Sequence, residues 1–147
     1  MRPTTAGTAI SANDFATFGV TANSGYQISL GSISRLDYKK STAGPVSGTL
    51  QYQIGSSGFN DVTNLSFSST SGASLGPIDL SNIAALQNVG PNTNVTFRLV
   101  FYGATDVGGN WYLFDFAVSS APDLAITGTI APIAPPAGVP VIAPTLV

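Results

Sequence analysis

The sequence contains no cysteine, no histidine and no glutamate. Without cysteine and histidine it cannot form a Cys/His zinc site, a disulfide, a thiol nucleophile or a Ser-His-Asp triad. The seven acidic residues are all aspartates and lie singly along the chain, with no Asp-x-Asp spacing typical of a calcium loop. We therefore expect a protein without enzyme activity and without a cofactor.

Charge of either sign is also scarce. Charged residues make up 8% of the chain, with five Lys or Arg and a formal net charge of −2, whereas a soluble domain usually has about 25%. So few cations cannot form the basic surface that binds nucleic acid. Little charge also means little repulsion between copies, so we expect a homo-oligomer or a polymer.

What the sequence does contain is 16 Gly, 10 Pro and short runs in which apolar and polar residues alternate. Alternation with a period of two is typical of strands, and it is clearest at residues 46–54. It predicts further strands at residues 14–21, 28–38, 62–67 and 124–130, with a bulge at Gly31-Ser32 where the parity slips. Residues 79–86 have helical spacing after Asp79, which predicts one or two helical turns.

Two alternating segments, 95–102 and 111–118, flank a Gly-rich stretch and predict a hairpin. In one register every pair on one face is apolar: Val95 with Val118, Phe97 with Phe116, Leu99 with Phe114 and Phe101 with Tyr112. The same register places Arg98 opposite Asp115, which predicts a structural ion pair or a site for a ligand carboxylate or sugar hydroxyl. Asp106 lies in the loop, where it either favours the turn or contributes to a structural calcium site.

These elements predict an all-β fold, an antiparallel two-sheet β-sandwich of jelly-roll-like type with about seven or eight strands. We expect an N-terminal extension at 1–12, the sandwich at 13–130 and an extended, apolar arm at 131–147. The arm contains five prolines, which exclude a regular transmembrane helix there. Its apolar residues could add to an exposed edge of another copy: Ile133, Val139, Val141, Ile142, Leu146 and Val147.

Four apolar residues of the predicted hairpin lie on the face turned away from the core: Val100, Tyr102, Trp111 and Leu113. Such a stripe is expected to be covered. The cover is either the protein's own arm or another copy, or the aromatic pair is a platform on which a sugar ring stacks. A third interpretation is that both faces lie in an ordinary thick core.

Several short segments carry a family resemblance: Asn13-Asp14-Phe15, Tyr26-Gln27-Ile28-Ser29-Leu30, Gly44-Pro45, Ser57-Gly58-Phe59, Asp79-Leu80, Val95-Thr96-Phe97-Arg98-Leu99, Tyr102-Gly103-Ala104 and Gly109-Asn110-Trp111-Tyr112-Leu113. Across about residues 13–129 the chain resembles a β-sandwich module of exported bacterial surface proteins, the PEP-CTERM or exosortase-associated proteins. The family often has Asp-Asn after its aromatic strand, where this chain has Asp115-Phe116. The Pro-Glu-Pro signal, helix and basic tail that anchor that family are not in this sequence, where the proline-rich segment stands instead.

The resemblance implies an extracellular or cell-surface location. Together with the low charge and the apolar arm, it leads us to expect a non-catalytic structural protein whose copies assemble through the arm, for example into a filament. The alternative is a carbohydrate-binding accessory module of an exported protein. A third possibility is a viral capsid-decoration or fibre protein.

Overall fold

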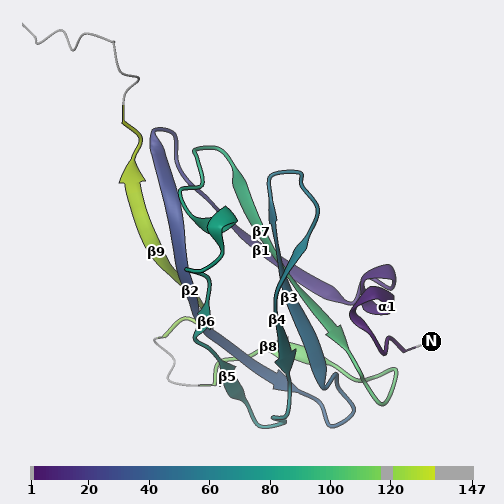
Figure 1. Ribbon diagram of the computed structural model, residues 1–147. Coiled ribbons are helices and arrows are strands. Elements are labelled where there is room, and N and C mark those ends of the chain that lie inside the picture. The colour runs from purple at the N-terminus through teal and green to yellow at the C-terminus, as the bar shows by residue number, and fades with distance from the viewer. Residues whose placement is uncertain (1, 117–120, 135–147) are drawn as a thin grey trace, which may run out of the picture.

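The computed structural model describes residues 2–116 and 121–134. In these residues nine strands form two antiparallel sheets that pack face to face (Figure 1). The predicted all-β, antiparallel two-sheet sandwich is therefore confirmed. No helix in the described part of the chain is long and apolar enough to cross a membrane.

The first sheet has four strands in the order β1-β7-β3-β4. Their bounds are Phe15–Thr21 for β1, Asn94–Tyr102 for β7, Ser47–Ile54 for β3 and Asn60–Ser66 for β4. The alternation in each strand turns one set of side chains into the sandwich. In β7, for example, Val95, Phe97 and Leu99 are buried in the core.

The second sheet is built on one long strand, β2 (Tyr26–Lys40). Its partners are β5 (Ala73–Leu75), β6 (Ile78–Asp79), β8 (Trp111–Leu113) and β9 (Leu124–Pro132). Leu36 pairs with both β5 and β9, so these two strands lie on opposite sides of β2. The pairing of β2 with β9 shifts register between Leu30 and Ser32, which confirms the bulge predicted at Gly31-Ser32.

The core lies between the sheets and ends in an aromatic cluster. Its fully buried members come from both sheets and include Ile33, Leu36, Leu50 and Phe97. At one end of the sandwich four rings pack together: Tyr38, Phe67, Phe101 and Trp111. Each large apolar side chain buried in this way stabilises the fold by about 1.5–3 kcal/mol.

The predicted hairpin of 95–102 with 111–118 is wrong. Strand β7 lies between β1 and β3, so both of its edges are already paired. The loop after β7 instead crosses to the other sheet, where β8 pairs with β2 and places Leu113 opposite Tyr38. Phe114 and Phe116 follow β8 and do not face β7, and Val118 lies outside the described residues.

The helical prediction at 79–86 holds only at its end. Asp79 belongs to strand β6, and only Ala84–Leu86 forms a short 3-10 helix, η1. A six-residue helix that the sequence analysis did not anticipate, α1 (Ala6–Ser11), forms in the N-terminal extension. Its N-terminus is a capping box in which Thr5 and Thr8 bond to each other's backbone amide.

Helix α1 packs against β7, and Ala9 on the helix is fully buried. Val100 of β7 is fully buried as well. It follows Leu99, which points into the core, so Val100 points to the opposite, outer face of the sheet. The N-terminal segment therefore covers this part of the first sheet.

Candidate functional site

The four residues predicted to share an outward face do not do so. Val100 is buried in the middle of the first sheet, whereas Leu113 is about half exposed on β8 of the second sheet. They separate because β7 and β8 belong to different sheets. Tyr102 and Trp111, however, come together at one end of the sandwich, because β7 ends and β8 begins there.

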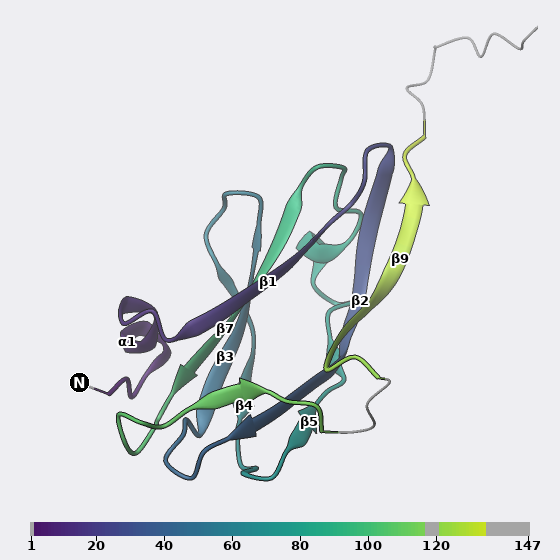
Figure 2. The same ribbon diagram turned by 180° about the vertical axis from the view of Figure 1, so that it is seen from behind.

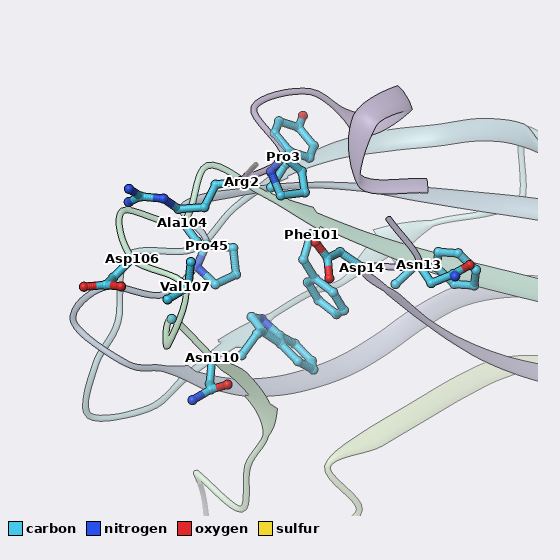
Figure 3. Close-up of a pocket in the computed structure, with 14 residues that line it drawn as sticks. Arg2, Pro3, Asn13, Asp14, Pro45, Phe101, Ala104, Asp106, Val107 and Asn110 are labelled. Carbon is cyan, nitrogen blue, oxygen red and sulfur yellow. The ribbon is translucent and has the colours of Figure 1, made fainter. Parts of the chain in front are cut away.

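Tyr102 and Trp111 both line a cavity of about 440 Å³, which we call the end cavity (Figure 3). Its walls come from the N-terminal segment, from the start of β1, from Pro45, and from the chain between Phe101 and Trp111. Asp106, the predicted turn or calcium residue, also lines it. The lining of the cavity therefore includes three of the residues selected from the sequence.

Backbone hydrogen bonds hold the walls of the end cavity together. Gly103 donates to Pro3 O at 2.9 Å, and Phe101 donates to Asp14 O at 3.0 Å. On the other side Thr105 donates to Ala43 O at 2.9 Å. A Cβ atom at Gly109 would overlap the carbonyl of Ala43, so the loop can approach this closely only with glycine there.

The apolar wall of the end cavity is aromatic. The Trp111 ring lies 4.7 Å from the Phe101 ring between centroids, and it stacks on Tyr38 at 6.2 Å. Its indole N–H is shielded from solvent and has no hydrogen-bond acceptor among the described residues. A buried donor without an acceptor is unfavourable by about 1–3 kcal/mol.

The polar wall contains Arg2, Asn13, Asp14, Asp106 and Asn110. Figure 3 shows Arg2 and Asp106 on one side of the cavity and Asn13 on the opposite side. Within the described part of the chain, no three carboxylates come close enough to form a metal site. The main-chain carbonyl of Asp106 accepts a hydrogen bond from the Gly109 amide at 3.0 Å, which closes the turn through the backbone and does not test the role predicted for the Asp106 side chain.

The predicted ion pair between Arg98 and Asp115 is also wrong, because the register that paired them does not occur. Arg98 lies on the outer face of the first sheet and donates through Nε to Gln51 Oε1 at 2.8 Å. Its guanidinium carbon lies 3.8 Å from the centre of the Phe59 ring. Burial lowers the pKa of Arg98, and the charge of Asp61 acts in the opposite direction.

The salt bridge found in the described residues is Arg35–Asp37 on β2, with 2.6 Å between Nη2 and Oδ2. Asp37 is fully buried. The hydrogen bond from Arg35 lowers the pKa of the Asp37 carboxyl below its ordinary value, against the effect of burial. This pair was not predicted from the sequence, although residues two apart on a strand share a face.

Strand β9 forms a long outer edge of the second sheet. It pairs with β2 on one side, and Figures 1 and 2 show no other strand beside it in the described part of the chain. It continues to Pro132, and the Ile133 amide donates to Gly25 O at 2.9 Å, so the first residues of the predicted arm belong to the sheet. The other predicted arm residues, Val139, Val141, Ile142, Leu146 and Val147, lie outside the described residues.

Comparison with models of known families, with curated proteins and with solved structures finds no match. The resemblance to the PEP-CTERM-associated module therefore stays a prediction. Function has to be argued from the end cavity and from the β9 edge.

Proposed function

We propose that this protein is a non-catalytic structural module whose copies associate through the outer edge of β9. The observation that carries the proposal is a nine-residue edge strand without a single charged residue. The last charge in the chain is Asp123, directly before the strand. Natural sheets usually protect a long edge with charge, proline, a bulge or a covering segment, because an unprotected edge pairs with other chains.

The backbone of β9 offers a regular set of groups for pairing. At one end of the strand Asp123 O accepts a hydrogen bond from the Asp37 amide of β2, and just past the other end the Ile133 amide donates to Gly25 O in the turn before β2. In an antiparallel strand the direction of these groups alternates from residue to residue, so the odd-numbered residues of β9 face β2. The amides of Leu124, Ile126, Gly128 and Ile130 therefore point outward and can bond to a further strand.

Side chains at the far end of this edge are apolar and exposed. Ile130 is 72% exposed and Ile133 is 42% exposed. Tyr26 of β2, which pairs with Pro132 of β9, is 46% exposed. A strand added to β9 would cover part of this surface. The burial of apolar area would then add to the backbone hydrogen bonds.

The other edges are less suited to association. Strand β4 carries Asp61, and β5 and β6 have only three and two residues. Strand β1 is a second long edge without charge, but its large apolar side chains, Phe15, Phe18 and Val20, are all partly buried. Exposed apolar side chains beside free backbone groups therefore distinguish β9 from β1.

Two β9 edges that pair antiparallel about a two-fold axis form a closed dimer with one continuous sheet. A polymer needs a second contact that does not close on itself, and residues 135–147, which continue from the end of β9, are the segment we propose for it. The proposal places this assembly at a cell surface, the location that the resemblance implies, or in an extracellular filament.

The test is the Ile130→Pro variant of the full chain. Proline removes one outward amide and leaves the inward amides that pair with β2. In sedimentation velocity over a concentration series, we expect the wild type to form dimers or larger species and the variant to shift toward monomer by at least tenfold in dissociation constant. Ile130→Val keeps the amide and the apolar surface, so it should behave like the wild type.

Ile130→Lys is a second variant that keeps every backbone donor and places a charge on the edge. It should also shift the protein toward monomer, and at a concentration at which both proteins are monomeric its thermal unfolding should match that of the wild type because Ile130 is largely exposed. A wild type that stays monomeric at every concentration contradicts the proposal. So does association of equal strength in all four proteins.

A further inference from the structure

Beyond association through β9, we propose that the end cavity binds a neutral saccharide. Its volume of about 440 Å³ lies within the range of about 300–1,000 Å³ found for small-molecule sites. It lies at the end of the sandwich where β7 ends and β8 begins, and β9 does not line it. The two proposals can therefore fail independently.

The aromatic wall suits the apolar face of a sugar ring. Trp111, Phe101 and Tyr102 contribute aromatic carbon to the lining, together with Pro3 and Pro45. A pyranose ring presents its C–H groups on one face, and such a face packs against an aromatic side chain. Aromatic rings are also held with little rotational freedom here, because Trp111 is packed against Phe101 and Tyr38, so little side-chain entropy is lost on binding.

The polar wall calls for hydroxyl groups. Asp14 and Asp106 only accept hydrogen bonds when ionised, Arg2 only donates, and Asn13 and Asn110 do both. A ligand that satisfies all of these must itself donate and accept at several positions, which is what a set of hydroxyl groups does. An ammonium group only donates, and a carboxylate or a fully ionised phosphate only accepts.

The charge of the wall excludes an anion as the preferred ligand. Two carboxylates and one guanidinium give the lining a formal net charge of −1 if all are ionised. A phosphate or a uronic acid would meet this charge with repulsion. A neutral sugar avoids this repulsion and can donate hydrogen bonds from its hydroxyl groups to both carboxylates.

Trp111, which lines the cavity, also carries a buried indole N–H. It has no acceptor among the described residues and is shielded from solvent. A ligand hydroxyl can accept this hydrogen bond only if the Trp111 ring or a neighbouring side chain shifts on binding and opens the N–H to the cavity. Binding would then remove an unfavourable feature of the free protein.

Trp111 is also the one tryptophan of the whole sequence, so tryptophan fluorescence reports directly on the end cavity. The full chain is titrated with neutral oligosaccharides of glucose, mannose and xylose, with oligogalacturonate as the anionic probe and choline as the cationic probe. We expect a saturable change in Trp111 emission with at least one neutral oligosaccharide and none with the charged probes. Calorimetry on the same samples measures the dissociation constant.

Two asparagines provide a matched pair of variants. Asn110 Nδ2 donates to Gly108 O at 3.0 Å, and Asn60 Nδ2 donates to Gly58 O at 3.3 Å, so each bonds to a carbonyl two residues before it. Only Asn110 lines the end cavity. Asn110→Ala should weaken saccharide binding at least tenfold, as should Asp106→Ala, whereas Asn60→Ala should leave it unchanged.

Thermal unfolding of each variant verifies that the fold is kept. The proposal is overturned if no neutral oligosaccharide changes Trp111 emission at millimolar concentration, or if Asn110→Ala and Asn60→Ala bind equally well. A response to oligogalacturonate or choline alone also overturns it, because the cavity then selects a charged ligand.

Discussion

The two sheets of the sandwich are built in different ways. In the first, four strands of seven to nine residues pair with one another along most of their length. In the second, every strand pairs with the 15-residue β2, and three of its four partners have only two or three residues. The remaining partner, β9, is long and has a free outer side in the described part of the chain.

This difference is the basis on which we propose that the second sheet, and not the first, is the one through which copies associate. The first sheet has a polar outer face in which Arg98, Gln51 and Asp61 are linked by hydrogen bonds, and α1 covers part of it. The second sheet ends in an uncharged edge with exposed Ile130. Both sheets have edge strands, but among the described residues only β9 combines a long uncharged edge with largely exposed apolar side chains.

The largest expected effect comes from deleting a core side chain in each sheet. Leu50 in β3 and Leu36 in β2 are both buried to 1% exposure or less. Leu50→Ala and Leu36→Ala should each lower the free energy of unfolding by about 2–5 kcal/mol. Because both side chains belong to one core, we expect a single transition with the same denaturant dependence in both variants.

Chemical denaturation followed by Trp111 fluorescence and by circular dichroism measures this effect. A second transition that appears only in Leu36→Ala would show that the β2 sheet unfolds separately. The two sheets would then differ in their stability as well as in their edges.

A smaller effect is expected from acid, and it should arise in the second sheet. Because the hydrogen bond from Arg35 lowers the folded-state pKa of Asp37 below its ordinary value of 3.8, this carboxylate stabilises the fold above that pH. The contribution is lost as the pH falls below about 3.8 and through the lowered pKa. Asp37→Asn should therefore be less stable than the wild type at neutral pH, and the difference should shrink in acid.

Thermal unfolding between pH 2 and pH 7 tests this prediction. Asp106→Asn is the control, because Asp106 lines the end cavity and is not part of the buried pair. If the difference between Asp37→Asn and the wild type stays constant over this range, the Arg35–Asp37 pair does not stabilise the second sheet in the way described.

Alternation along the sequence predicted the strands but not all of their partners. The clear period of two in β3 and β7, and the parity slip at Gly31, each correspond to a feature of the structure. The hairpin failed because a Gly-rich loop between two alternating segments is compatible with a tight turn and with a crossing to the other sheet. Periodicity gives the face on which a residue lies, not the strand beside it.

Three residues that line the end cavity were selected from the sequence, but the cavity itself was not predicted. Tyr102 and Trp111 were selected as aromatic residues away from the core, and they do line one cavity, but as the ends of strands in different sheets. Arg2, Asn13 and Asp14 reach it through tertiary contacts that no local pattern encodes. Helix α1 did have a local signal, the Thr5 and Thr8 of its capping box.

The central claim, that β9 is the surface through which copies associate, is tested most directly by amide hydrogen exchange at two protein concentrations. The outward amides of Ile126, Gly128 and Ile130 should exchange quickly in dilute protein and become protected as the concentration rises. The inward amides of Ala125, Thr129 and Ala131 should be protected at both concentrations because they face β2. Outward amides that exchange at the same fast rate at both concentrations would contradict the account.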